Sequence, residues 1–439
     1  MNQTDLNSLY DKGGFFVITG LSPNTRLEFG IDLNIWDTAE KFMGLKLIPS
    51  GLHLISYSSI DKNNSVGLKS SFFTYFKPGQ LLVLNWNKET ESLQESTLSV
   101  DELSALRNRI RDLDKNLGCY PILDQILDQP GSSKRPKQNS DLYDQWIKLT
   151  NYISENTLAN VFGCSSIIRN VYTFSSATGS GYDTREYQDA IKTLESINNN
   201  VEDKNQNKII SNNLDDKLDF LNNEPGKDSF FFKTIDLKKS FDSKTHTPSQ
   251  ISSYSVDKSF LLANVLNRYS EGPIGLLGEM QITFLLLLIG QNFAGFEHYK
   301  QIVGLVTQSS SAIAYSVGNN KEFDDILGDN TKKIKGDSLL KGLFVPFTKI
   351  LIKQLKHCPE DFFSSLLTSD NFFVKCIRDY IVNVGVTDSN VEGIELLNSE
   401  MEELRTVFKK RFNVDLPTYS ELLEAEEEGS DNEYAPVIV

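Results

Sequence analysis

A long polar segment divides this chain of 439 residues into two parts that must build separate cores. Across residues 175–250, asparagine, lysine, serine and aspartate dominate, most densely in residues 198–208. So few apolar side chains cannot offset the conformational entropy that folding costs, and we therefore predict a disordered linker. We place the linker at residues 166–254. Two islands inside it could be ordered, a short helix at residues 187–197 and a strand or docking segment at residues 230–235.

The part before the linker, residues 1–165, has the pattern of strands separated by turns. Four short runs of β-branched and aromatic side chains are predicted strands: residues 15–18, 52–57, 72–76 and 81–86. Short strands of this kind, split by turn residues, are typical of a β-sandwich. One helix is predicted to begin after Ser99 as its cap and to end near Gly118, and another covers residues 141–161.

The part after the linker, residues 255–413, has helical periodicity and no strand signal. Consecutive amphipathic helices pack as a bundle or a stack. Its most apolar run, residues 282–289, is much shorter than the roughly 20 residues of a membrane span, so we interpret it as a buried core helix. The predicted fold class is α+β with two domains, an N-terminal β-sandwich-like domain with flanking helices and a C-terminal all-α domain.

Charge and composition narrow the classes of partner. The chain has 59 acidic and 44 basic residues and a formal net charge of -15. Affinity for nucleic acid depends on Lys and Arg neutralising phosphates, so we expect no sequence-specific nucleic-acid binding. The expected partner is instead a protein with a basic surface. The four cysteines lie far apart and only four histidines occur, so we predict neither a metal nor any other cofactor. Reduced thiols and a polar start without a signal peptide predict the cytoplasm and nucleus.

The candidate catalytic residues have structural interpretations that fit better. Glu297 and His298 are adjacent on a predicted helix and point about 100° apart, so they form no natural acid–base dyad. Glu279 could pair with His298 between two helices, and a structural role is favoured for that pair. The glycine-rich residues 178–181 lack the context of a phosphate loop. A carboxylate cluster is conceivable at three positions, where turn stabilisation is the better account: Asp32, Asp37 and Glu40. Three tryptophans are predicted core anchors: Trp36, Trp86 and Trp146.

The end of the chain joins an acidic tail to a strand-like tip. Residues 414–439 contain no Lys or Arg, and such a run is normally solvated. An extended tip can add itself to an exposed sheet edge of a partner, and an acidic spacer can steer it to a basic surface. Docking on the chain's own sandwich, or an inert end, is the alternative. The predicted partner-binding residues are Pro436, Val437, Ile438 and Val439.

Four serines near the start of the helical part are candidate phosphorylation sites: Ser249, Ser252, Ser253 and Ser255. A phosphate adds a charge of about -1.5 to -2. On an acidic molecule this added charge would favour release from a partner. Ordinary linker serines are the alternative, and the sequence does not choose among the four.

Several segments resemble the cistron-splicing factor family. Residues 27–59 place Gly-Ile-Asp before Trp36, then the segment KFMGLK, then IPSG and an alternating strand, in the order of that family's signature. Four later segments are similar to further family motifs in the same order: residues 113–121, 146–153, 278–305 and 435–439.

This resemblance implies a non-enzymatic assembly chaperone of the U5 small nuclear ribonucleoprotein (snRNP) in pre-mRNA splicing. Such proteins bind the C-terminal RNase H-like and Jab1/MPN region of the large U5 scaffold protein (pre-mRNA-processing-splicing factor eight). They block premature docking of the U5 RNA helicase and are released in a step linked to phosphorylation. The Asn-rich linker departs from the family pattern, so no particular phosphosite is carried over. A helical adaptor unrelated to splicing is the alternative function, and an enzyme is the least favoured class.

Overall fold

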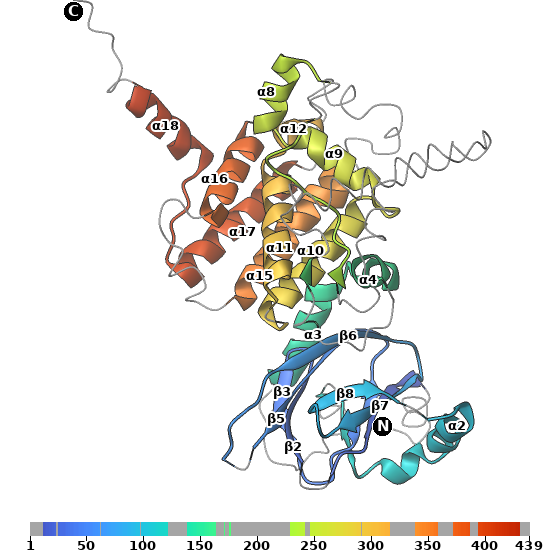
Figure 1. The fold of residues 1–439 in the computed structure, drawn as a ribbon. Coiled ribbons are helices and arrows are strands. Elements are labelled where there is room, and N and C mark those ends of the chain that lie inside the picture. The colour runs from blue at the N-terminus through green and yellow to red at the C-terminus, as the bar shows by residue number, and fades with distance from the viewer. Residues whose placement is uncertain are drawn as a thin grey trace, which may run out of the picture. The chain divides into compact units, whose positions relative to one another are not determined.

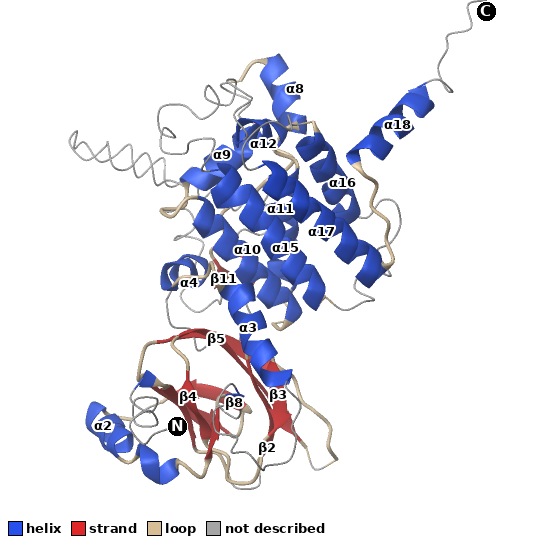
Figure 2. Cartoon of the chain, turned by 180° about the vertical axis from the view of Figure 1, so that it is seen from behind, coloured by secondary structure: helices blue, strands red, loops and turns tan. Residues whose placement is uncertain are grey.

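The computed structural model describes part of the chain in detail. The described residues are 12–121 without 23, 24, 62 and 97, then 138–163, 171, 175–176, 229–241, 246–316 without 291, 339–358, 372–386 and 394–430. Internal contacts divide the chain into two units. We call Met1–Phe232 with Ile289–Ala294 the β unit, and Lys233–Leu288 with Gly295–Val439 the helical unit. The β unit holds the strands, whereas the described residues of the helical unit form helices and loops (Figures 1 and 2). The predicted two-domain α+β class is therefore confirmed.

Two larger sheets form the β unit. The first has the order β8 (Ser92–Glu95), β7 (Leu81–Asn87), β1 (Gly14–Thr19), β4 (Gly44–Ile48) and β9 (Leu117–Cys119). The second is antiparallel, with the order β3 (Asn34–Asp37), β2 (Arg26–Ile31), β5 (Gly51–Ile60) and β6 (Ser70–Phe76). The first sheet is mixed, because β1 pairs parallel with β7 and antiparallel with β4. A short parallel pair, β10 (Ser175–Ser176) with β11 (Ser229–Phe230), is separate from both.

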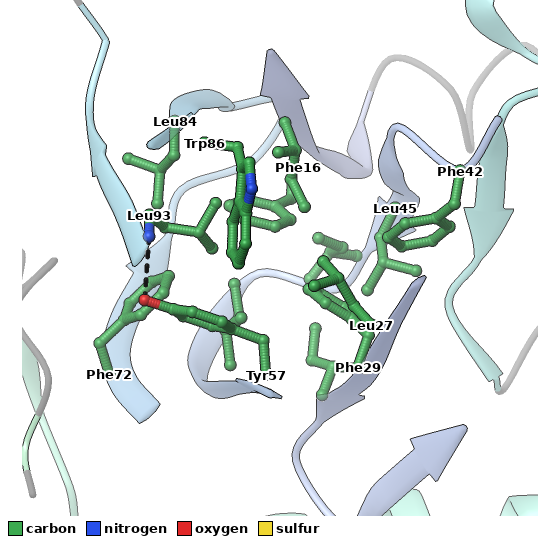
Figure 3. Packing of buried hydrophobic residues seen from close by; sticks show 14 of the residues in the cluster. Phe16, Leu27, Phe29, Phe42, Leu45, Tyr57, Phe72, Leu84, Trp86 and Leu93 are labelled. Atoms are coloured by element: carbon green, nitrogen blue, oxygen red, sulfur yellow. Dashed lines mark hydrogen bonds between the residues drawn. The ribbon is translucent and has the colours of Figure 1, made fainter. Parts of the chain in front are cut away.

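Aromatic side chains from the two larger sheets meet in one core (Figure 3). Phe16 of β1 stacks on Phe29 of β2 with ring centroids 5.9 Å apart. Tyr57 of β5 meets Trp86 of β7 edge-on at 6.0 Å, and its hydroxyl accepts a hydrogen bond of 3.0 Å from the Leu93 amide. Two apolar faces packed on each other bury both sheets, as in a sandwich. The predicted β-sandwich-like arrangement is therefore confirmed.

All three tryptophans contact cores of the β unit, as predicted. Trp86 and Trp146 are 5% and 0% exposed, and Trp36 is partly buried against the same cluster as Trp86. The indole nitrogen of Trp146 donates a hydrogen bond of 2.9 Å to the Leu52 carbonyl. This bond satisfies the one polar atom of the buried ring.

The described helices of the β unit differ from prediction at two points. They are α2 (Val100–Asn108), the 3-10 helix η1 (Ile110–Leu113), α3 (Gln138–Thr150) and α4 (Glu155–Phe162). Ser99 caps α2 with Glu102 in a capping box, as predicted. The prediction of a helix end at Gly118 was wrong, because Gly118 lies in β9 opposite Leu45 of β4. The single helix predicted at residues 141–161 is two helices, since Ser154 leaves the helical conformation and caps α4.

The described part of the helical unit contains ten helical segments. They are α8 (Pro248–Val256), α9 (Ser259–Asn267), α10 (Pro273–Leu288), α11 (Phe293–Thr307), α12 (Ser310–Ser316), the π-helical turn η5 (Leu340–Phe344), α15 (Val345–His357), α16 (Phe372–Gly385), α17 (Ile394–Phe412) and α18 (Tyr419–Ser430). The side chains of α10 are buried from Gly275 to Leu286, so the prediction of a buried core helix is confirmed. Among the residues described, no helix has the length and apolarity to cross a membrane.

Two helices occur where the composition suggested none. Helix α8 begins at Pro248, inside the range assigned to the linker, because Thr247 and Gln250 form a capping box and proline fits the first helical position. Helix α18 lies in the acidic tail. There Thr418 and Glu421 exchange hydrogen bonds in the same way, with the Thr418 amide donating to the Glu421 carboxylate and the Glu421 amide donating to the Thr418 hydroxyl.

Candidate functional site

The β unit buries a histidine–carboxylate pair at the turn between β2 and β3. Asp32 has a left-handed backbone (φ 58°) and is 3% exposed. One carboxylate oxygen accepts from the Leu54 amide at 3.0 Å. The other accepts from the Tyr120 hydroxyl at 2.5 Å and lies 2.8 Å from Nδ1 of His53. Asp32 therefore joins three separate segments of the chain.

His53, the other member of this pair, is buried too, at 2% exposed. The second ring nitrogen of His53 lies 2.9 Å from the Pro49 carbonyl, so both ring nitrogens contact oxygen atoms inside the unit. Burial, and then the negative charge of Asp32, raise the pKa of Tyr120 far above its ordinary value, which keeps its hydroxyl a donor. A buried group with all its hydrogen bonds internal cannot take a substrate proton, so the pair acts as a cross-link.

The three carboxylates that could have formed one cluster are separate. Asp37 is exposed and lies 3.7 Å from Arg26 in an ion pair. Glu40 is exposed too. Asp32 does occupy a turn, but its side chain bonds to residues distant in sequence rather than to the turn alone.

The helical unit buries a second pair, and the predicted contact between two helices is confirmed. Nε2 of His298 on α11 lies 2.6 Å from Oε1 of Glu279 on α10, and the two residues are 5% and 1% exposed. The Lys233 amide donates to the same oxygen at 3.2 Å. Burial, and then Glu279, hold the pKa of Tyr269 well above its ordinary value. Glu297 instead forms a surface ion pair of 2.5 Å with Lys300, so Glu297 and His298 point to different partners, as predicted.

Two of the cysteines are protected by burial, whereas Cys119 is partly exposed. Burial raises the pKa of the Cys358 and Cys376 thiols to about 12, which keeps them protonated and poor nucleophiles. In the part of the chain that is described, no three His, Cys, Asp or Glu side chains are grouped to hold a metal ion. The glycine-rich residues 178–181 lie outside the described residues. The remaining candidate features, the α8 serines and the root of the tail, lie at the surface.

The four candidate serines lie on one short exposed helix. Ser249, Ser252, Ser253 and Ser255 are all exposed on α8. On its other side, the Tyr254 ring stacks on Phe260 with centroids 4.9 Å apart.

A buried lysine holds the end of this helix. Lys258 donates to the Ser255 carbonyl and, at 3.2 Å, to the Ser240 hydroxyl. Burial lowers the pKa of Lys258. The four serines are therefore presented to solvent on a helix that is fixed from beneath.

The predicted binding tip, Pro436 to Val439, lies outside the described residues, but the root of the tail is described. After α17 the chain turns at Asn413, which has a left-handed backbone (φ 55°). The Leu416 side chain is then buried, at 1% exposed. Tyr419, the first residue of α18, packs against Gly385 of α16, where a Cβ atom would collide with its ring. The acidic tail therefore begins as an attached segment rather than a free one.

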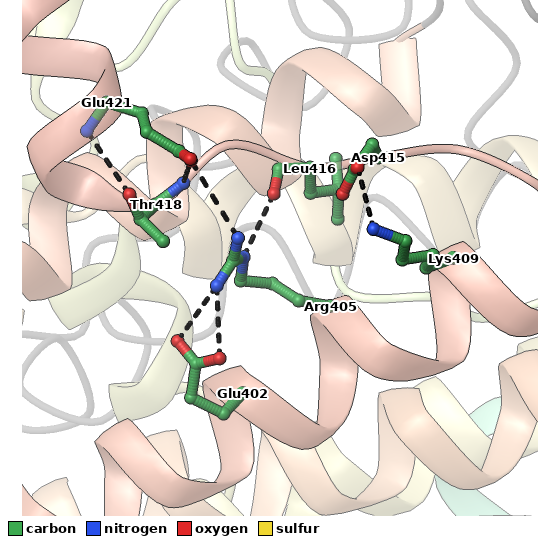
Figure 4. A network of polar contacts seen from close by, with 7 residues as sticks. All are labelled: Glu402, Arg405, Lys409, Asp415, Leu416, Thr418 and Glu421. Atoms are coloured by element: carbon green, nitrogen blue, oxygen red, sulfur yellow. Dashed lines mark hydrogen bonds and ion pairs between the residues drawn. The ribbon is translucent and has the colours of Figure 1, made fainter.

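Arg405 of α17 lies at the centre of this attachment (Figure 4). Its Nε donates to the Leu416 carbonyl at 2.9 Å, and one terminal nitrogen contacts both oxygens of Glu402 at 3.1 and 3.0 Å. The other terminal nitrogen lies 3.9 Å from Glu421 at the start of α18. Close by, Lys409 forms a more exposed ion pair of 2.9 Å with Asp415.

Two features of these sites escaped the sequence analysis. Asp32, His53 and Tyr120 all lie in segments that carried the family resemblance, but nothing in their spacing paired them. Thr418 and Glu421 match the capping-box pattern T-x-x-E, which would have predicted the start of α18.

Comparison with known proteins gives matches in both units. A family model described as the AAR2 N-terminal domain matches residues 12–163, and one described as the AAR2 C-terminal repeat region matches residues 232–417. Curated relatives named "Protein AAR2 homolog" include one from Mus musculus, 27% identical over 433 residues, with 94% of this chain and 92% of the relative covered. The homologue from Homo sapiens is 26% identical over 415 residues, covering 93% and 91%. That from Caenorhabditis elegans is 27% identical over 409 residues, covering 93% and 97%.

Proposed function

The chain belongs to the AAR2 family of splicing factors, and from this premise we propose that it is a non-enzymatic assembly chaperone of the U5 snRNP. It binds the C-terminal RNase H-like and Jab1/MPN region of the large U5 scaffold protein and blocks premature docking of the U5 RNA helicase. It acts in the cytoplasm and nucleus. One observation carries this proposal, namely that the family match extends through both units, at residues 12–163 and 232–417.

The chemistry of the described residues is consistent with binding rather than turnover. The two histidine–carboxylate pairs are buried with internal partners, and the buried thiols are held protonated. A formal net charge of -15 favours a partner with a basic surface over a nucleic acid.

In this proposal the tail supplies part of the affinity. Pro436, Val437, Ile438 and Val439 add as a strand to a sheet edge of the scaffold protein, where backbone hydrogen bonds give affinity. The glutamates ahead of the tip attract it to a basic surface.

Release follows phosphorylation of serines on α8. Their exposure makes them accessible to a kinase. The effect of a phosphate on α8 depends on which serine carries it. At Ser249, in the first turn, its negative charge interacts favourably with the helix dipole. A phosphate in the last turn, at Ser253 or Ser255, opposes the dipole and weakens α8.

The decisive experiment is purification of the tagged full chain from cells, with mass spectrometry of what accompanies it. We expect the large U5 scaffold protein to be recovered and the U5 RNA helicase to be absent from the same complex. The same purification without residues 435–439 should recover less scaffold protein. Recovery of other partners alone, with normal splicing after depletion, would favour an adaptor unrelated to splicing and would exclude this function.

A further inference from the structure

Helix α18 has little in its own sequence to keep it folded. It has 12 residues, and an isolated helix of that length is marginal in water. None of its described side chains, residues 419–424, is fully buried. Glutamates continue toward its C-terminal end, where negative charge opposes the helix dipole, and no basic residue lies in its last turn. Contacts outside the helix must therefore hold it.

Arg405 supplies one such contact, and it also holds the segment that leads into the helix. Its side chain is only 20% exposed, and the guanidinium bonds to the Leu416 carbonyl and the Glu402 carboxylate, with Glu421 of α18 at 3.9 Å. Charge-assisted bonds of this geometry are stronger than neutral ones, and the planar group can serve three oxygens at once. By contrast, the Lys409–Asp415 pair is 67% and 72% exposed, and exposed pairs contribute little.

We infer that Arg405 clamps the root of the C-terminal tail to α17 and thereby sets how far the tip of the tail can reach. The inference rests on the proposed function, in which the tip binds the same partner as the body of the chain. The family match at residues 232–417 ends just before α18, so this clamp joins the matched region to the tail that follows it.

The number of residues between the last fixed residue and Val437 limits how far the tip can extend. With α18 attached, seven residues separate Ser430 from Val437, and they can span at most about 25 Å. With the root released, 24 residues separate Asn413 from Val437, with an upper limit of about 86 Å. The binding edge on the partner must therefore lie within about 25 Å of the end of α18.

A shorter tether also raises the local concentration of the tip. For a freely sampling tether that spans its target, this concentration falls with the −3/2 power of length, so lengthening from seven to 24 residues lowers it about sixfold. The clamp therefore strengthens binding without contacting the partner.

The test compares Arg405→Met with Lys409→Met, which removes the same charge from the same helix one turn away. The first measurement is amide hydrogen exchange of residues 419–424 in the free, full-length variants. The second is affinity for a scaffold-protein fragment containing the RNase H-like and Jab1/MPN domains, with and without residues 435–439 of this chain. Arg405→Met should expose the α18 amides and weaken binding about sixfold in the full chain but not in the tail-deleted chain. Lys409→Met should do neither.

The outcomes separate this inference from the proposed function. Unchanged exchange in Arg405→Met overturns the clamp. The clamp is also overturned if Arg405→Met releases α18 but leaves the affinity for the scaffold fragment unchanged or increased, while deletion of residues 435–439 weakens binding. If the scaffold fragment does not bind at all, the proposed function fails, and the exchange measurement alone then decides whether Arg405 holds the root of the tail.

Discussion

The two units each bury one histidine–carboxylate pair, and the pairs differ in how much of the chain they join. In the β unit, Asp32 receives hydrogen bonds from the Tyr120 hydroxyl and the Leu54 amide in addition to its contact with His53. It therefore holds a turn, a strand and the segment after β9 together.

In the helical unit, Glu279 contacts His298 and accepts from the Lys233 amide. It holds two consecutive helices and one extended segment. A histidine–carboxylate pair that would suggest acid–base catalysis in an open cleft therefore serves as a cross-link when it is buried. The strength of such a cross-link should follow the number of donors that depend on the carboxylate.

The largest effect is expected for Asp32→Ala. It leaves three buried groups without their partner, one of them on a histidine, and removing one member of a buried pair costs about 3–5 kcal/mol. We expect a loss near the upper end of that range. The three tryptophans, Trp36, Trp86 and Trp146, all belong to the β unit, so their fluorescence during urea unfolding reports on this unit.

The matched control is Asp37→Ala, which removes an exposed carboxylate from the next strand and should cost less than about 0.5 kcal/mol. If the two substitutions have equal effects, the buried network is not what holds the β unit.

A smaller loss is expected for Glu279→Ala, because hydrogen-bond contacts from His298 and the Lys233 amide end on this carboxylate, whereas the nearby Tyr269 hydroxyl lies outside hydrogen-bond geometry. We expect about 3 kcal/mol, at the lower end for a broken buried pair. Circular dichroism at 222 nm follows the helical unit, so its urea transition should move while the tryptophan transition stays in place. Glu297→Ala, which removes only a surface pair with Lys300, is the control. A loss larger than that of Asp32→Ala would contradict the rule of counting donors.

Tyr120→Phe removes one donor from Asp32 and leaves its contact with His53 intact. Loss of one buried hydrogen bond to a charged group costs about 1.5–3 kcal/mol, and Asp32 keeps two partners, so we expect a value near 1.5 kcal/mol. Tryptophan fluorescence again measures it. A loss as large as that of Asp32→Ala would mean that the Tyr120 hydroxyl, rather than the contact between Asp32 and His53, stabilises the network.

How far the sequence predicted these sites depended on distance along the chain. Glu279 and His298 are 19 residues apart on consecutive helices, and their pairing could be proposed from the helical pattern alone. His53 lies 21 residues from Asp32 and Tyr120 lies 88 residues from it, and their meeting depends on strand register and on the order of strands in two sheets. Such non-local pairing has no signature in local periodicity.

The elements that were predicted are likewise those with a local sequence signal. Strand β5 and helix α10 were predicted because alternation and apolar periodicity are local signals. Glycine suits a helix cap and a close strand contact equally well, so the sequence could not place Gly118, and only the sheet pairing distinguishes the two. Helix α18 was missed because its acidic composition outweighed a capping box and a clamp from Arg405.

The smallest effect concerns Glu421, a carboxylate that is exposed where Asp32 and Glu279 are buried. Hydrogen bonds from the backbone and then the side chain of Thr418 lower the pKa of Glu421. A carboxyl group with a lowered pKa in the folded state stabilises that state above its unfolded pKa, about 4.3 for glutamate. This stabilisation is lost as the pH falls through the lower folded pKa. We therefore expect α18 to fray below about pH 4 before the rest of the helical unit changes.

Amide chemical shifts of residues 419–424 across a titration from neutral to acidic pH measure this fraying. Glu421→Gln keeps an oxygen that can accept from Thr418 but cannot titrate, so it should remove the acidic step, whereas Glu424→Gln should preserve it. If the step persists in Glu421→Gln, another carboxylate holds the start of the helix. The result would then show whether an exposed cap and the clamp at Arg405 are sufficient to fold an acidic helix, or whether burial is required, as it is for the two histidine pairs.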